Sequence, residues 1–122
     1  MTINRDELRR GCFVLHVRKD MVEQFREAHR NVWPEYLEAL TAAGFEHYSS
    51  FISDDGLFVG YLESRDPRAA LAQLGSTDVD RRWQLEMEPY WEAPAAPGAQ
   101  SAKTLLHEAF DLDEALRASP LR

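Results

Sequence analysis

A tight turn in the middle of the chain joins two β-prone runs and decides much of what the chain can fold into. Residues 45–52 and 57–63 are rich in aromatic and β-branched side chains, and a four-residue segment that ends in Asp55 and Gly56 separates them. An Asp-Gly pair between two such runs is typical of an antiparallel β-hairpin. The sequence therefore predicts an antiparallel sheet, and the flanking segments decide what packs against it.

An amphipathic stretch precedes the hairpin. Over residues 22–40 the apolar side chains recur at steps of three and four, which places them along one helical stripe. Pro34 lies inside this stretch and removes a backbone donor, so we expect two helical segments that meet just before it. Gly44 is typical of a helix end. Asp20, followed three residues later by Glu23, resembles a capping box at the start.

A second helical stretch, in two pieces, follows the hairpin. Asp66 and Pro67 are typical of the N-cap and first position of a short helix, which Gly75 ends. Residues 76–78 are expected to cap the second piece. Along that piece the apolar side chains again recur every three or four residues until Pro89 ends or bends the helix.

Each end of the chain supplies a further β-prone run, and the order of elements indicates the fold class. Residues 11–18 predict a first strand, and residues 103–110 predict a last one. Residues 93–101, rich in Ala, Pro and Gly, predict a flexible loop. Residues 111–122 form an acidic tail with a possible short helix.

The resulting order, β-α-β-β-α-β over a single domain of residues 1–122, is that of the ferredoxin-like split βαβ unit. This is an α+β fold, an antiparallel sheet with helices on one face. The other face of the sheet would be bare, and a chain of this size should not expose it. We therefore expect a homodimer in which two sheets face each other.

Composition excludes several classes of function. The chain has 14 Lys plus Arg against 21 Asp plus Glu, a net charge of -7, which argues against nucleic acid and anionic membrane surfaces as partners. Its single cysteine, Cys12, excludes a disulfide framework within one chain. No apolar run approaches the roughly 20 residues of a membrane span, and residues 1–10 do not resemble a signal peptide. We expect a cytoplasmic protein.

His29 is the first of three candidates for chemistry. It lies at the expected helix break, with Phe25 one turn before it and Trp33 one turn after it. Histidine titrates near neutrality, so it can donate and accept a proton at working pH. A core histidine that bonds a backbone carbonyl would produce the same pattern, and both interpretations are open.

Trp83 and Tyr48 are the other two candidates. The indole of Trp83 offers a flat apolar surface and one donor, which suits the C–H face of a sugar or another flat ligand, but its spacing also fits a buried helix stripe. Strand alternation puts Tyr48 and Ser50 on one face and Phe51 on the other. A polar-lined face could border a small wet pocket or belong to an edge strand facing solvent.

The sequence gives little support for a metal or a bound cofactor. It contains no HExxH, CxxC or His-x-His pattern, no Gly-rich phosphate loop and no Gly-x-Ser-x-Gly elbow. His16 and His107, in the first and last predicted strands, are expected to be structural.

Four motifs resemble those of the L-rhamnose mutarotase family, in the same order and spacing. Residues 25–35, Phe-Arg-Glu-Ala-His-Arg-Asn-Val-Trp-Pro-Glu, are similar to the family's Tyr-x-x-x-His-x-x-(Ile/Val)-Trp-Pro-Glu. Residues 76–83 are similar to a segment in which Asp-Val leads to Arg/Lys-Trp-Trp. Residues 47–49 match Asn-Tyr-(Ser/Ala), and residues 106–110 match a closing Glu-Val-Phe strand. The resemblance runs from about Gly11 to Leu112.

The resemblance implies a dimeric α/β barrel of ferredoxin-like domains that interconverts the anomers of a free deoxyhexose such as L-rhamnose, with no cofactor. The family's proton donor corresponds to His29. Its sugar contacts correspond to Phe25, Tyr48, Trp83 and Gln84, and Trp33 is a further candidate contact beside His29.

Two of these positions depart from the family pattern. Phe25 replaces a tyrosine, and Gln84 replaces the second tryptophan of the pair. Because His29 is kept, we expect the reaction to be kept, while the identity of the sugar stays open.

Two other classes of function fit the residues. One is a cofactor-free monooxygenase or a haem-binding protein of the same barrel group, in which the aromatic walls would hold an aromatic ligand. The other is a non-catalytic sugar-binding module, to which the changes at Phe25 and Gln84 lend weight.

Overall fold

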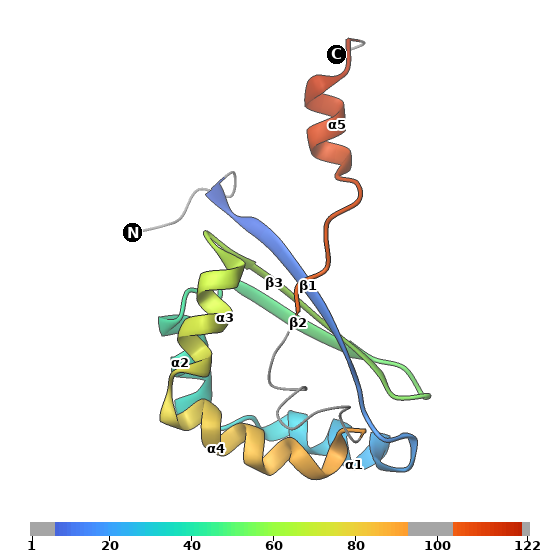
Figure 1. Ribbon diagram of the computed structural model, residues 1–122, viewed down its shortest axis with the longest axis vertical. Coiled ribbons are helices and arrows are strands. Elements are labelled where there is room, and N and C mark those ends of the chain that lie inside the picture. The colour runs from blue at the N-terminus through green and yellow to red at the C-terminus, as the bar shows by residue number, and fades with distance from the viewer. Residues whose placement is uncertain (1–6, 93–103, 121–122) are drawn as a thin grey trace.

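Three strands form one antiparallel sheet in the computed structural model, which describes residues 7–92 and 104–120 (Figure 1). The strands β1 (Arg9–His16), β2 (His47–Ile52) and β3 (Leu57–Ser64) lie in the order β1-β3-β2. The predicted hairpin is confirmed: Gly56 adopts a φ of +96°, which the turn requires. The first and third strands are neighbours, as in a split βαβ unit.

The helical stretch before the hairpin is broken where Pro34 predicts it. It contains η2 (Lys19–Met21), α1 (Val22–Ala28), η3 (His29–Asn31) and α2 (Pro34–Ala42), with Pro34 as the first residue of α2. Gly44 follows α2 with a φ of +103°, which confirms the predicted stop. The capping box at Asp20 is wrong, because α1 has no side-chain cap and the Asp20 carboxylate pairs instead with Arg18 at 3.1 Å.

The second helical stretch has the two predicted pieces. These are α3 (Pro67–Gly75) and α4 (Asp78–Met87), and the turn η4 (Glu88–Tyr90) follows α4 at Pro89. The Asp66 side chain accepts from the backbone N–H of Ala69 at 3.1 Å, and the Thr77 hydroxyl accepts from the N–H of Asp80 at 3.2 Å. Both caps satisfy donors that the first helical turn leaves free.

The strand expected at 103–110 is wrong over the described residues 104–110, which have no regular secondary structure. This segment runs along the edge of β1. The backbone N–H of Leu106 bonds the Cys12 carbonyl at 2.7 Å, but no regular ladder of β-sheet hydrogen bonds surrounds this bond among the described residues. The Asp111 side chain then caps α5 (Leu112–Ala118), which projects away from the sheet and takes the chain off its edge (Figure 1). The predicted loop at 93–101 lies outside the described residues.

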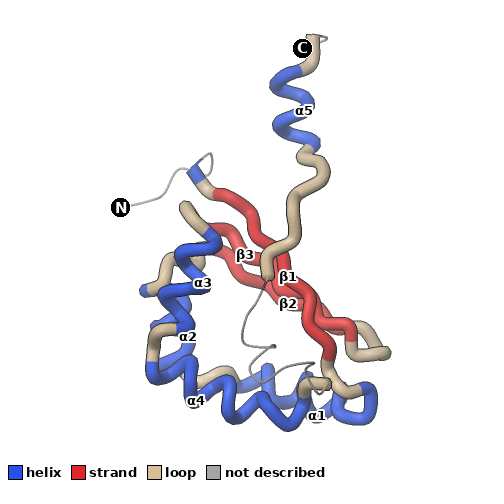
Figure 2. The backbone as a smooth tube through the Cα atoms, viewed as in Figure 1, coloured by secondary structure: helices blue, strands red, loops and turns tan. Residues whose placement is uncertain are grey.

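The core lies between the sheet and the helices. Helices α1–α4 lie on one side of the sheet (Figure 2), which confirms the α+β class. Strand register turns Phe13, Phe58 and Leu62 to that side, and all are at most 5% exposed. The opposite face carries Phe51, which is 62% exposed. No helix among the described residues is long and apolar enough to cross a membrane.

One close approach inside the core gives a test of the fold. Gly60 faces Phe13 across β3 and β1, and a Cβ added to Gly60 would overlap the ring of Phe13. We expect Gly60→Ala to lower the free energy of unfolding by about 1–3 kcal/mol, because the core must shift to accept the methyl group. Urea denaturation at fixed protein concentration measures the change.

Gly75→Ala is the matched control. Its added methyl group meets nothing within 4 Å at the end of α3, so the variant should be neutral or more stable by up to about 1 kcal/mol. Equal destabilisation by both substitutions would contradict the packing described for Gly60.

Candidate functional site

A cavity of about 380 Å³ opens between the inner face of the sheet and helices α2 and α4. Its size falls within the range of roughly 300–1,000 Å³ that is common for small-molecule sites. Its lining is mainly apolar and aromatic with a few polar groups: Leu15, His29, Val32, Tyr36, Leu37, Leu40, Thr41, Phe45, Tyr48, Ser50, Phe58, Trp83, Gln84, Met87 and Trp91.

The helix break positions His29 at this cavity. His29 is the first residue of η3, and its Nδ1 lies 3.0 Å from the backbone carbonyl oxygen of Phe25 one turn earlier. A carbonyl only accepts, so Nδ1 carries the hydrogen and the neutral ring keeps its lone pair on Nε2. The hydrogen bond to the backbone thus leaves Nε2 as the nitrogen available to a ligand.

The surroundings of His29 favour the neutral imidazole. Burial lowers the pKa of His29 below its ordinary value of 6.5, and the hydrogen bond to the Phe25 carbonyl opposes this effect in part. The rings of Phe25 and Trp83 lie 4.2 and 5.6 Å from the imidazole. At neutral pH the site therefore presents an uncharged base in an aromatic setting.

Trp83 connects His29 to the wall formed by α2. Its indole stacks on the ring of Tyr36 at 5.1 Å and 18°, and the indole of Trp33 meets it edge-on at 5.1 Å. At 6% exposed, Trp83 is both a member of the buried helix stripe and part of the cavity lining. The two interpretations of this residue are thus compatible.

A surface ion pair joins two of the sequence motifs. The guanidinium of Arg82, next to Trp83, binds both carboxylate oxygens of Glu35 at 3.0 and 3.1 Å and also contacts Asp78. The hydrogen bond from Arg82 holds the pKa of Glu35 below its ordinary value. This fork joins the first turn of α2 to α4 at the surface of the two helices that wall the cavity.

Tyr48 reaches the same cavity from β2, on the face that strand alternation assigns to it. Burial, with the nearby Asp80 carboxylate second, raises the pKa of Tyr48 to about 12. At neutral pH the phenol keeps its proton and is a hydrogen-bond donor.

The structure brings together four of the six predicted site residues around the cavity: His29, Tyr48, Trp83 and Gln84. Phe25 and Trp33 lie outside its lining. Phe25 is 2% exposed and packs beneath His29, and Trp33 is half-buried against Trp83. Both aromatic rings thus support residues that face the cavity.

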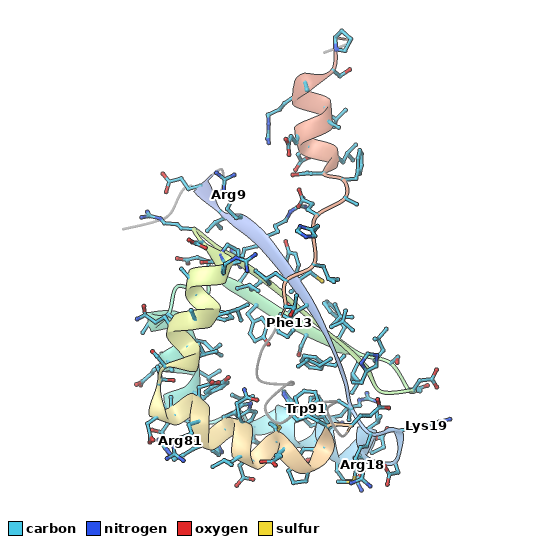
Figure 3. The ribbon with its side chains drawn as sticks, viewed as in Figure 1. Arg9, Phe13, Arg18, Lys19, Arg81 and Trp91 are labelled. Carbon is cyan, nitrogen blue, oxygen red and sulfur yellow. The ribbon has the colours of Figure 1, made fainter. Side chains whose placement is uncertain are left out.

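Three residues at the site escaped the sequence prediction. The Tyr36 hydroxyl donates to Asp80 Oδ1 at 2.7 Å, behind the cavity wall. Trp91, seen between the sheet and α4 in Figure 3, is 8% exposed, and its indole N–H has no acceptor in the part of the chain that the structure describes. The signal for Asp80 is a carboxylate one turn before Gln84 on a helix whose other stripe positions are apolar.

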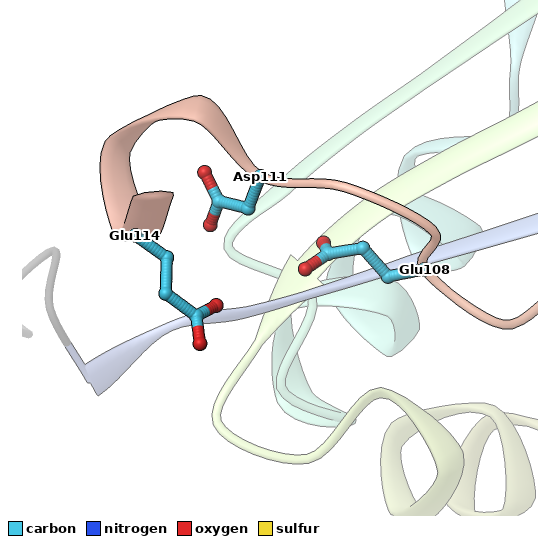
Figure 4. Close-up of side chains that lie close together, drawn as sticks. All are labelled: Glu108, Asp111 and Glu114. Carbon is cyan, nitrogen blue, oxygen red and sulfur yellow. The ribbon is translucent and has the colours of Figure 1, made fainter. Parts of the chain in front are cut away.

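One group of carboxylates elsewhere could face a cation. Glu108, Asp111 and Glu114 lie together where the segment after residue 104 passes β1 and enters α5 (Figure 4), with ligand oxygens within 4.8 Å of one another. The Arg10 guanidinium already pairs with Glu108 at 2.6 Å and with Asp111 at 3.0 Å. Glu108 and Asp111 therefore belong to an ion-pair network with Arg10, and none of the three carboxylates lines the cavity beside His29.

Comparisons with known proteins match the chain over most of its length. A family model described as L-rhamnose mutarotase matches residues 10–112. An L-rhamnose mutarotase of Bacillus subtilis (strain 168) is 34% identical over 83 residues, which cover 67% of this chain and 79% of the relative. One of Burkholderia cenocepacia (strain HI2424) is 37% identical over 76 residues, which cover 62% of this chain and 73% of the relative.

Solved structures show the same fold. A crystal structure of an L-rhamnose mutarotase from Formosa agariphila superimposes with a TM-score of 0.67 at 20% identity, covering 85% of this chain and 98% of that one. A putative antibiotic biosynthesis monooxygenase from Nitrosomonas europaea superimposes with a TM-score of 0.53 at 19% identity, covering 77% and 88%. The likeness to both structures concerns the fold alone.

The protonation of His29 gives a test of the site. Its pKa in the folded protein is lower than in the unfolded chain, so on acidification the unfolded chain binds the proton first. The contribution of His29 to stability is therefore complete above about pH 6.5 and is lost as pH falls through the lower pKa of the folded state.

We expect NMR titration of the His29 ring to give a pKa below 6.5. The free energy of unfolding of the wild type, relative to that of His29→Gln, should fall as pH falls below 6.5. An imidazole that titrates above 6.5 would contradict the burial described for this residue.

Proposed function

Because the chain belongs to the L-rhamnose mutarotase family, we propose that it is a carbohydrate isomerase that interconverts the α and β anomers of L-rhamnose or a related 6-deoxyhexose. His29 is the acid–base group, and Tyr48, Trp83 and Gln84 contact the sugar. The observation that carries the proposal is His29 itself, held by the Phe25 carbonyl with Nε2 left for a ligand at a cavity of about 380 Å³.

The reaction needs one proton carrier. Nε2 of neutral His29 accepts the proton of the anomeric hydroxyl, and the imidazolium then donates a proton to the ring oxygen as the bond from the anomeric carbon to that oxygen breaks. The aldehyde forms, rotates and closes from its other face by the reverse steps. Burial that lowers the pKa of His29 keeps the base form populated at neutral pH.

The aromatic lining supplies the binding surface for such a substrate. The indole of Trp83 is held in place by stacking on Tyr36 and offers a flat apolar surface for the C–H face of a pyranose. Phe25 and Trp33 support the site from behind, since they pack on His29 and Trp83. A neutral sugar needs no electrostatic steering, so the net charge of -7 does not hinder its entry.

We also propose that the functional unit is a homodimer joined through the outer faces of two sheets. Phe51 and Leu57 are 62% and 42% exposed on that face, beside the half-buried Val14 and Val59. A contiguous apolar surface of this kind marks an interface. In a two-fold symmetric dimer, this patch on one copy packs against the same patch on the other, so both are buried.

We infer a cytoplasmic location as well. Cys12, the single cysteine of the chain, is a free thiol, which suits a reducing compartment.

The first experiment on function is anomer exchange by saturation-transfer NMR with L-rhamnose, L-fucose and L-mannose. We expect the wild type to accelerate exchange, and His29→Gln to lower kcat/KM by about 10²–10⁴-fold, because general acid–base catalysis contributes about that much. His107→Gln, at an exposed histidine, is the matched control and should keep full activity.

The alternatives give different results in the same experiment. Acceleration of none of the three sugars would overturn the assignment. Sugar binding by calorimetry without acceleration would indicate a binding module, and oxygen uptake with a quinol would indicate a monooxygenase. Full activity of His29→Gln would remove only the role of His29.

The dimer has its own test. We expect Phe51→Glu to shift the protein from dimer to monomer in sedimentation equilibrium, because a carboxylate cannot be buried between the sheets without a partner. Leu85→Glu changes a similarly exposed leucine (55%) on α4 and should remain a dimer. A Phe51→Glu protein that stays dimeric would place the interface elsewhere.

A further inference from the structure

A buried carboxylate lies behind the polar part of the cavity wall. Asp80 on α4 is 7% exposed, and its Oδ1 accepts from the Tyr36 hydroxyl at 2.7 Å and from Gln84 Nε2 at 3.2 Å. We call Tyr36, Asp80 and Gln84 the Asp80 cluster. Tyr36 and Gln84 line the cavity, so Asp80 contacts two lining residues at once.

Asp80 is held by neutral donors and not by an ion pair. The two arginines that follow it on α4 point to other acids, Arg81 to Asp78 and Arg82 to Asp78 and Glu35. Among the residues that the structure describes, no salt bridge reaches Asp80. Burying a carboxylate that is bound only by neutral donors costs solvation free energy. A structural link between α2 and α4 is therefore a weak explanation for a buried carboxylate at this position.

The cluster determines what Gln84 offers to a ligand. Gln84 Nε2 donates to Asp80 Oδ1 at 3.2 Å, so the Gln84 amide turns its NH₂ toward Asp80. The amide oxygen then serves as the acceptor on the cavity side. The Tyr36 hydroxyl is used on the same carboxylate, and burial and Asp80 raise its pKa, so it stays a donor to Asp80. Gln84 is thus an acceptor with a fixed orientation.

We propose that Asp80 is a positioning residue for substrate specificity: through the Asp80 cluster it fixes Gln84 as the hydrogen-bond acceptor for one hydroxyl of the bound sugar. This inference rests on the proposed function of the cavity as a sugar site. It deepens that function, because it assigns one wall of the cavity to a hydroxyl of the sugar, where a larger apolar side chain would contact a C–H face.

A double-mutant cycle tests this role. We expect Asp80→Ala and Gln84→Leu each to raise KM for L-rhamnose by about tenfold, the equivalent of one hydrogen bond, with kcat changed by less than about threefold. The double variant should be no worse than either single variant, because both remove the same contact. Asp80→Asn keeps an acceptor for both donors and should restore KM to within about threefold of the wild type.

Two further variants keep the test decisive. Asp80→Cys, close to aspartate in size but with only a weak acceptor, replaces Asp80→Ala if that protein does not fold. Glu86→Ala removes an exposed carboxylate from the same helix and should leave KM unchanged. The Kd for L-rhamnose, from tryptophan fluorescence, is measured for every variant.

The outcomes separate this inference from the proposed function. If the wild type binds sugar without accelerating exchange, and Kd follows the cycle above, the function falls and the role of Asp80 stands. If the wild type is active and Asp80→Ala loses stability with KM unchanged, the role of Asp80 is overturned. KM effects that multiply in the double variant would overturn it too, because Asp80 would then not act through Gln84. A wild type that neither binds nor exchanges sugar overturns both.

Discussion

The missing backbone N–H of Pro34 is the constraint on which the site depends. A continuous helix from residue 22 to residue 42 would carry His29 past the sheet on a straight rod, and Pro34 prevents it. The chain instead makes one 3-10 turn and starts a new helix. At that turn the His29 ring lies 3.0 Å from the Phe25 carbonyl oxygen, which fixes the imidazole tautomer. The break in the helix thus also sets where the imidazole lies, the group that we propose for acid–base chemistry.

Core and site are one aromatic cluster in this protein. The ring of Phe25 contacts Phe58 at 5.4 Å and Trp91 at 5.2 Å within the core, and the same ring lies 4.2 Å from His29. The packing that stabilises the fold therefore also desolvates the imidazole and lowers its pKa. The position of Trp83 follows from similar contacts. Its indole stacks on Tyr36 of α2, and the preceding residue, Arg82, pairs with Glu35 of the same helix. The surroundings of His29 and the stability of the fold are therefore not independent in this protein.

Local signals in the sequence predicted most of the local structure, and they failed where a competing contact or a distant partner decided the outcome. The N-cap at Asp66 depends on neighbours three residues away and was confirmed. The cap at Asp20 was wrong because Arg18 competes for the carboxylate, and residues 104–110 are no strand because the chain turns away into α5. Motifs identified four residues of the cavity lining, but not Asp80, whose partner Tyr36 lies 44 residues away. The burial of a polar residue on a helix can be predicted only when the helix that packs against it is known.

The aromatic wall and the polar wall of the cavity would contact different parts of the proposed sugar substrate. For the proposed sugar substrate, Trp83 and the apolar lining would accept the C–H surface of the pyranose, a contact that depends on shape and tolerates different ring substituents. A hydrogen bond to an acceptor of fixed orientation discriminates more strongly, because a sugar without the matching hydroxyl leaves a buried polar group unpaired. Under the proposed function, the proton transfer assigned to His29 would be common to all aldoses and would select none of them. The proposal therefore assigns specificity to the polar wall, where Gln84 occupies the position of the tryptophan of the family pattern.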